Sequence, residues 1–227
     1  MNSRLKNALL AVAAAGLASS AQATYTTGDL LVGFDKSGAA TDFVYDIGPY
    51  SSLTDGETWS LGSLLQATDP KFATLDNVEF GVVGANNSTK TIYSTTDGSF
   101  VPQENVNAFN TLRSAVGTIG GGIGVGAVSG ASYGSPDVGS GKDWNANTLN
   151  PTLASQFGSY WNPNAVSPGP AYLFASDNSG DQAVGAGSFT LANDGTLTFN
   201  VPEPGTGLLA GVGLLTLALR LQRLRRA

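Results

Sequence analysis

The chain has 227 residues, enough for one domain, and contains no cysteine, no histidine and a single methionine. These absences exclude a disulfide framework, a cysteine-based zinc site, a Ser-His-Asp triad and a Cys-His pair. The net charge is −6, but all 17 acidic residues lie between Asp29 and Glu203 with only five basic residues, so this stretch carries about −12. Such an acidic body repels phosphate backbones, which excludes nucleic acid as a partner.

The first 23 residues have the parts of a secretory signal peptide. Arg4 and Lys6 form a positive beginning, and an apolar stretch of about ten residues follows over 8–17. Ala21 and Ala23 supply the small residues of a cleavage site. The apolar stretch is shorter than the roughly 20 residues that span a bilayer. We therefore expect residues 1–23 to be a signal peptide that signal peptidase removes after Ala23.

Residues 24–200 form the body of the protein and are dominated by apolar segments of strand length. Phe43, Tyr45 and Ile47 alternate with other residues, which is the period-two pattern of a half-buried strand. Residues 36–40 and the Asn-Asp-Gly sequence at 193–195 have the composition of hairpin turns. The pattern predicts strands over 28–35, 41–47, 77–84, 90–96, 171–176, 183–191 and 195–200.

Helices are predicted to be fewer than strands. Residues 103–119 follow Pro102 and place apolar side chains at spacings of three and four, as an amphipathic helix does. Shorter helical turns are expected within 60–67 and 149–160. We predict a mainly β body, sandwich-like, with one or two helices packed on it.

Residues 117–141 contain ten glycines in 25 positions. The spacing of Gly124, Gly126 and Ser129 fails the G-x-G-x-x-G pattern of a nucleotide-binding loop, because serine stands where the third glycine belongs. We therefore expect a glycine-rich loop here and no nucleotide site.

Oxygen-bearing side chains are grouped near the end of the body. Asp177, Asn178 and Asp181 surround Gly180, as donors do in cation-binding loops. The segment lacks the twelfth-position glutamate of an EF-hand, and an ordinary polar hairpin loop is the alternative. Calcium is the only cofactor that the sequence suggests.

Aromatic side chains offer a second kind of binding site. Tyr160 and Trp161 lie in a segment rich in Pro, Asn and Ser, and could stack on a pyranose ring. Trp59 and Trp144 are further candidates. For each of them the alternative is a residue of the core or a loop anchor.

Carboxylates are the only catalytic groups that the composition leaves. Glycoside hydrolysis needs two of them about 5 to 10 Å apart. Only Glu57, Glu79 and Glu104 are glutamates among the 17 acidic residues. With so many carboxylates, chance alone places some pair at that distance, and we expect Glu79 on a solvated face. The body is therefore predicted not to be an enzyme.

The C-terminal 27 residues have the pattern of a membrane anchor. Residues 205–219 are uncharged and reach about 22 Å as a helix, which is short for a span. Arg220, Arg223, Arg225 and Arg226 can extend to the headgroups and stay on the cytoplasmic side. We expect one transmembrane helix, with the body outside and the tail inside. An amphipathic helix of a soluble domain is the alternative.

Pro202, Glu203 and Pro204, followed by the apolar stretch and the arginine-rich end, resemble the PEP-CTERM sorting signal. The resemblance covers 201–227, and the strand expected before it is similar to the one that leads into that signal. It implies an exosortase, a membrane cysteine peptidase or transpeptidase, that cuts near Pro-Glu-Pro and releases or transfers the body. The two prolines favour this, because they keep the segment extended and accessible.

The resemblance also implies where the protein is located and which partner it meets. Proteins with this signal occur in Gram-negative bacteria that make exopolysaccharide and biofilm matrix. We expect an exported precursor, anchored in the inner membrane and then passed to the periplasm, cell surface or exterior, with exopolysaccharide as a partner. The leading hypothesis is a structural or adhesive matrix protein. A calcium-assisted carbohydrate-binding module and a secreted glycosidase are the alternatives.

Overall fold

A computed structural model describes most of the body but neither end of the chain. The predicted signal peptide and the segment from residue 202 onward, with its predicted transmembrane helix, lie outside the described residues. Within the described part, no helix has the length and hydrophobicity needed to cross a bilayer. The described residues are 25–99, 101–102, 108–123, 132–157, 161–177 and 182–201.

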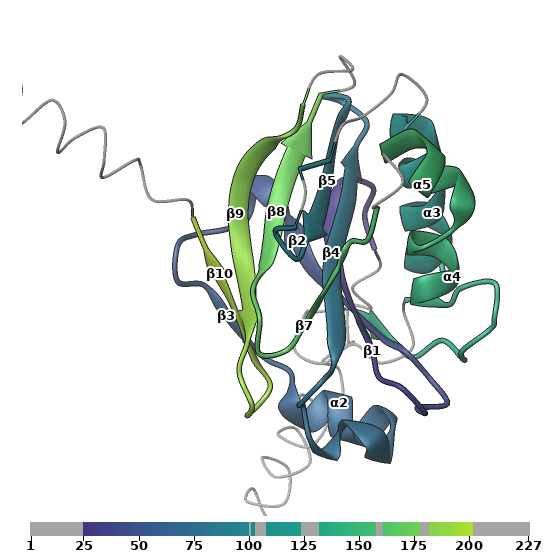
Figure 1. The fold of residues 1–227 in the computed structure, drawn as a ribbon, viewed down its shortest axis with the longest axis vertical. Coiled ribbons are helices and arrows are strands. Elements are labelled where there is room, and N and C mark those ends of the chain that lie inside the picture. Colours follow the sequence, from purple (N-terminus) through teal and green to yellow (C-terminus); the bar gives the residue numbers. More distant parts are fainter. Residues whose placement is uncertain are drawn as a thin grey trace, which may run out of the picture.

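Ten strands of the described chain join into one curled antiparallel sheet (Figure 1). Nine of them follow the order β3-β10-β9-β8-β5-β4-β1-β2-β6, and β7 pairs with β4. The strands are β1 (Asp29–Asp35), β2 (Phe43–Pro49), β3 (Thr58–Ser60), β4 (Glu79–Asn86), β5 (Thr91–Thr96), β6 (Tyr133–Gly134), β7 (Asn164–Val166), β8 (Ala171–Ser176), β9 (Val184–Leu191) and β10 (Thr196–Asn200).

The described helices lie in two places. Three of them stand together against the outer face of the sheet, and α2 lies at one end of the curl (Figure 1). The helices are α2 (Gly62–Thr68), α3 (Ala108–Gly120), α4 (Trp144–Thr148) and α5 (Pro151–Phe157), with 3-10 turns at η1 (Tyr50–Ser52) and η2 (Pro70–Ala73).

The mainly β character is confirmed, but the prediction of a sandwich is wrong in one respect. A sandwich has two separate sheets, whereas here β5 pairs with β8 from Ile92 to Thr96 and joins the two halves. The sheet instead curls until its inner face packs on itself. The Tyr50 hydroxyl, directly after β2, donates to the Ala186 carbonyl of β9 at 3.0 Å, although four strands separate β2 from β9 in the sheet. Alternation in a sequence identifies the faces of strands and not their partners.

The inner face of the curl holds the larger core. Period-two side chains from β1, β2, β4, β8, β9 and β10 meet there, and α2 and η2 close one end through Leu65 and Phe72, both fully buried. The Phe189 and Phe199 rings lie 5.0 Å apart, and Phe199 meets Tyr50 edge-on at 6.4 Å. Burial of these rings is the main apolar contribution that keeps the sheet curled.

A second core lies between the helices and the outer face of β1, β4 and β5. It contains apolar side chains of α3, at the spacing that the sequence predicted, together with Trp144 of α4 and Leu153 and Phe157 of α5. Leu30, Leu31 and Val32 of β1 are all fully buried, because this strand is covered on both faces. A continuous apolar run is the pattern expected of such a strand.

The seven predicted strands are all found, with bounds that differ by no more than two residues. Both predicted hairpin turns are present: Ala39 N–H donates to the Lys36 carbonyl at 2.9 Å, and Thr196 N–H donates to the Asp194 side chain at 2.8 Å. Gly195 has a φ of 84°, which favours glycine. The short strands β3, β6 and β7 were not predicted, since two or three residues carry too little pattern.

The predicted helical segments are found where they can be compared, but the described helices outnumber the one or two expected, and α4 was not predicted. α3 begins at Ala108, and residues 103–107 of the predicted helix lie outside the described residues. The turns expected within 60–67 and 149–160 correspond to α2 and α5. The described parts of the glycine-rich segment form the end of α3, the short β6 and the loop that leads to α4.

Candidate functional site

The last strand, β10, connects the body to the segment that resembles a sorting signal. It pairs with β9 on one edge and with β3 on the other, and Leu197 and Phe199 point into the inner core. Val201 N–H donates to the Asp55 side chain at 2.9 Å, which fixes the chain just before Pro202. Proline has no N–H to continue a ladder. Every described strand and core residue therefore precedes the Pro-Glu-Pro sequence.

Many of the predicted site residues lie outside the described residues, and the structure says nothing about them. They are Ala21, Ala23, Tyr160, Asn178, Asp181, Pro202, Glu203, Pro204, Arg220, Arg223, Arg225 and Arg226.

Trp161 corrects one prediction, because it is not available for stacking on a sugar. It is 6% exposed, and its ring stacks on Phe157 at 4.2 Å in the second core. Its indole N–H donates to the Thr148 carbonyl at 2.6 Å. Trp144 is fully buried, and Trp59 is half-buried against Phe189. These aromatic residues follow the alternative reading, as parts of the two cores.

Asp177 follows β8 and is exposed, but the rest of the predicted calcium loop lies outside the described residues. Across the part of the chain that the structure describes, no group of three or more acidic residues is placed to hold a metal ion. Calcium binding by 177–181 stays a prediction.

The two described glutamates, Glu57 and Glu79, lie in different surroundings. Glu57 accepts a hydrogen bond from Thr54 N–H at 2.9 Å in a turn. Glu79, in β4, is half-buried rather than fully solvated, and it accepts a hydrogen bond from the Asn164 side chain at 3.4 Å. Glu104 lies outside the described residues.

Three aspartates gather around the start of α4, and no pattern in the sequence predicted this cluster. Asp143 caps the helix by accepting a hydrogen bond from Ala146 N–H at 2.6 Å, and it also accepts one from Gly139 N–H of the preceding loop at 2.6 Å. Asp42 comes just before β2, is 1% exposed, and accepts a hydrogen bond from Trp144 N–H at 2.7 Å. Asp35 ends β1 beside Asp42.

The carboxyl group of Asp42 has a strongly raised pKa. Its pKa is about 7, raised mainly by burial and to a smaller extent by the neighbouring carboxylates Asp143 and Asp35, while the Trp144 N–H lowers it. The Oδ1 atom of Asp42 is buried without a partner among the described residues. A proton on Asp42 can be donated to the neighbouring Asp35 side chain.

A chain of amides extends this cluster across the second core. The Trp144 indole N–H donates to the Asn164 side chain, Asn164 donates to Asn145, and Asn145 donates to Asp35, each at 2.9 Å. Gly33 lies beneath the Trp144 ring, where a Cβ atom would overlap it. The network ties α4 and β7 to β1.

A second acidic pair lies at the other end of the β1–β2 hairpin. The pKa of Asp46 is about 6, raised mainly by burial and also by Asp29, while the Gly48 N–H lowers it. Burial also raises the pKa of Tyr25 to about 12, together with Asp29 and Asp46. Each end of this hairpin therefore carries a carboxyl group whose pKa burial raises.

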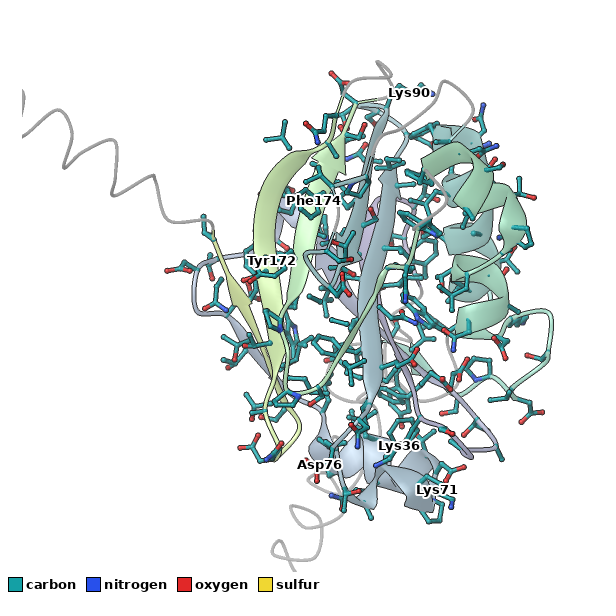
Figure 2. All side chains as sticks on the ribbon, in the orientation of Figure 1. Lys36, Lys71, Asp76, Lys90, Tyr172 and Phe174 are labelled. Carbon is teal, nitrogen blue, oxygen red and sulfur yellow. The ribbon has the colours of Figure 1, made fainter. Side chains whose placement is uncertain are left out.

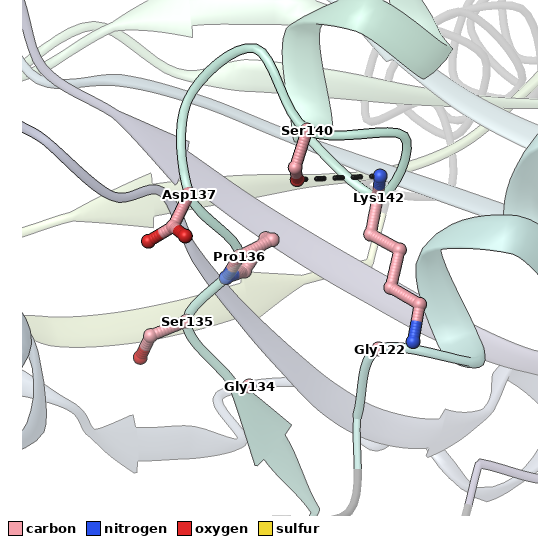
Figure 3. Close-up of a pocket in the computed structure, with 7 residues that line it drawn as sticks. All are labelled: Gly122, Gly134, Ser135, Pro136, Asp137, Ser140 and Lys142. Atoms are coloured by element: carbon pink, nitrogen blue, oxygen red, sulfur yellow. Dashed lines mark hydrogen bonds between the residues drawn. The ribbon is translucent and has the colours of Figure 1, made fainter.

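A pocket of about 450 Å³ lies where the glycine-rich segment meets the loop before α4 (Figure 3). Its ammonium group is already engaged, because Lys142 Nζ donates to the Gly121 carbonyl at 2.8 Å. The backbones approach closely there, since a Cβ atom on Gly134 would lie 2.6 Å from the Gly122 carbonyl oxygen. The lining residues are Gly122, Gly134, Ser135, Pro136, Asp137, Ser140 and Lys142.

Comparison with known proteins identifies the C-terminal segment. The family model of the PEP-CTERM protein-sorting motif matches residues 200–226. No curated protein and no solved structure matches the chain. The match begins at Asn200, the last residue of β10, and contains Pro202, Glu203 and Pro204. Residues 200–226 are thus a PEP-CTERM sorting motif, which makes the chain an exported protein that an exosortase processes from a membrane-anchored precursor sorted to the cell surface.

Proposed function

We propose that the body of this protein is a structural or adhesive component of a biofilm matrix rich in exopolysaccharide. The observation that carries the proposal is the position of the sorting motif, which begins at the last residue of the last strand. Sorting through this motif delivers a folded body to the place where a matrix protein acts. The body then works by binding or assembly rather than by catalysis.

Processing takes place in two steps in this proposal. Signal peptidase removes residues 1–23, and a helix over 205–219 then holds the precursor in the inner membrane. The four terminal arginines keep the tail on the cytoplasmic side. The exosortase cuts near Pro202–Pro204, and the body passes to the periplasm, cell surface or exterior.

The end of the fold suits a cut at this position. β10 is held on both edges, and its neighbour Val201 is fixed by Asp55. The prolines that follow cannot extend a strand or a helix, so they leave an accessible segment for a peptidase. Cleavage there removes none of the described contacts of the body.

Two observations support a body without catalytic activity. The chain has no histidine and no cysteine, which leaves carboxylates as the only acid-base groups with a pKa near neutral. Asp42, whose pKa is raised to about 7, is 1% exposed and is engaged by the backbone of α4. A substrate has no access to a group in that position.

Intact-mass measurement of the protein from the medium and the cell envelope tests the proposed processing. We expect one species that starts at Thr24 and ends near Pro204. A Glu203→Gln variant is expected to accumulate uncut in the membrane fraction. The matched control is Asp76→Asn, which removes one exposed negative charge from the body and is expected to be processed normally.

The role of the body needs a separate measurement. A strain that lacks this protein is expected to grow normally and to lose cell aggregation and matrix retention. Recovery by the wild-type protein and not by the Glu203→Gln variant would support a function that depends on sorting. Hydrolysis of a matrix polysaccharide by the purified protein would contradict the proposal and favour a glycosidase.

A further inference from the structure

Two aromatic side chains lie one after the other along the outer face of β8. Tyr172 is opposite Thr96 of β5, and Phe174 is opposite Ser94, in an even register that places both rings on the same face. Tyr172 is 43% exposed and Phe174 is partly exposed. Figure 2 shows both of them along β8, at a distance from the helices that cover the other half of the sheet. Their Cα atoms are about 6.6 Å apart at the usual rise of a strand.

The same face continues over the next two strands with small polar side chains. Ser188 of β9 lies directly opposite Tyr172, and Asn200 of β10 lies opposite Ser188. Thr190 and Thr198 form the next pair on this face. All of these side chains are partly exposed, and each carries a hydroxyl or amide group.

No charged residue occurs in β3, β8, β9 or β10. This is unusual in a body with 17 acidic residues against five basic ones between Asp29 and Glu203. The described helices α3 and α4 pack on β1, β4 and β5 instead, and no described helix lies over β8, β9 and β10 (Figure 1). The face is therefore accessible, uncharged and rich in hydrogen-bonding groups.

The Tyr172 ring is held in place by the turn after β5. Gly98 lies beneath it, and a Cβ atom at Gly98 would be 2.7 Å from Cε2 of the ring. Gly98 has a φ of 86°, so glycine is favoured there for its backbone as well as for its size. A ring supported in this way loses little freedom when a ligand stacks on it.

We infer that this surface, defined by Tyr172, Phe174, Ser188, Thr190, Thr198 and Asn200, binds a neutral polysaccharide. The faces of aromatic rings are negative and attract the C–H groups of a pyranose, while hydroxyl and amide groups match the hydroxyls around the sugar ring. Because the surface has no cation and the body is strongly acidic, it does not suit an anionic chain. The inference rests on the proposed function, since it names the matrix component that the body contacts.

A second copy of the chain is a poorer match for the surface. A stable interface buries about 800 Å² on each partner with an apolar centre. Two partly buried rings, each with at most about 150 to 250 Å² of total area, supply only a fraction of that. The surrounding serine, threonine and asparagine side chains favour a hydroxyl-rich ligand.

Affinity electrophoresis of the detergent-solubilised full chain in gels that contain dextran, laminarin, xyloglucan or alginate tests the inference. We expect retardation by at least one of the three neutral polymers and none by alginate, which is anionic. Tyr172→Ala and Phe174→Ala are each expected to weaken that retardation about tenfold. Tyr172→Phe keeps the ring and is expected to keep binding, as is Val166→Ala, which changes an exposed apolar residue on β7.

Several results would overturn the inference: no retardation of the folded protein by any neutral polymer, binding only to alginate, or binding that Tyr172→Ala and Phe174→Ala leave unchanged. Concentration-dependent dimerisation that Tyr172→Ala abolishes would assign the surface to a second copy instead. Circular dichroism of each variant checks that the fold is retained. The assay uses unprocessed protein, so its failure is distinct from a failure of sorting, which intact mass reports.

Discussion

The two halves of the curled sheet differ in what covers their outer faces: helices pack on β1, β4 and β5, and no described helix packs on β8, β9 and β10. β1 and β4 are covered by helices and read as nearly continuous apolar runs, with Leu30 to Val32 fully buried. β10 alternates between buried and partly exposed residues, because only its inner face is covered. A strand buried on both faces needs apolar residues throughout, whereas a half-buried strand is free to vary every second position. The covered half therefore buries both of its faces, whereas the bare half leaves partly exposed side chains on its outer face.

Among the substitutions that shorten a side chain, the largest effect is expected where the covered half has its most buried aromatic ring. Trp144→Ala removes a fully buried side chain and leaves the Asn164 side chain without its indole partner. We expect a loss of about 3 to 5 kcal/mol in the free energy of unfolding, measured by urea denaturation. Trp59→Ala, in the half-buried β3, should cost clearly less. Equal losses would mean that helix cover makes no difference.

The pH dependence of stability should come mainly from the covered half. The folded pKa of Asp42, about 7, lies above its ordinary value of 3.8, so its contribution is fully present below about pH 4 and is lost as the pH rises through 7. Asp46, with a pKa of about 6, acts in the same direction. We expect the free energy of unfolding to fall between pH 5 and 7.5, with a slope of up to about 1.4 kcal/mol per pH unit for each proton.

Urea denaturation of Asp42→Asn at several pH values separates the contribution of Asp42 to the pH dependence from that of the other titrating groups. The amide cannot titrate, so the slope should become shallower, while the exposed Asp76→Asn should keep the wild-type slope. The range stops at pH 5 because hydrogen bonds lower the pKa of Asp69 and Asp97, whose contributions are lost in more acidic solution. A wild-type slope in Asp42→Asn would contradict the assignment.

A matched pair of glycines compares the two halves directly. Gly33 lies under Trp144, so Gly33→Ala forces the ring or α4 to move, and we expect a cost of about 1 to 3 kcal/mol. Gly185 in β9 has open space where a Cβ atom would lie, and its φ is outside the left-handed region, so Gly185→Ala should be neutral or slightly stabilising. Thermal denaturation of both variants checks this. A similar cost at both positions would remove the distinction between the halves.

The comparison also explains what sequence could predict. Strand positions and hairpin turns follow from alternation and from residues such as Asn193 and Gly195, which are local signals. The pairing of β5 with β8 joins segments about 80 residues apart, and nothing local encodes it. The buried network of Asp35, Asp42 and Asn164 depends on that assembly in the same way.

The candidate sites also divide into those with a local sequence signal and those that depend on the assembled fold. The sorting motif could be recognised from sequence because it is linear, with Pro202 to Pro204 followed by an apolar stretch and arginines. Tyr172 and Trp161 have similar local surroundings in the sequence, yet one is 43% exposed and the other 6%. Their exposure is decided by which half of the sheet lies beside them, so sequence alone did not show that Trp161 is buried.

The smallest effect is expected on the bare half. Thr198 lies in the middle of the uncharged surface, and no described helix covers it. Thr198→Lys should cost less than about 1 kcal/mol in urea denaturation, because a charge on an open face stays solvated and only strand propensity changes. Val83→Lys, in the covered half, buries an unpaired charge in the second core and is expected to prevent folding. A cost above about 2 kcal/mol for Thr198→Lys would mean that another element covers this face. The surface assigned to a polysaccharide would then have a different occupant.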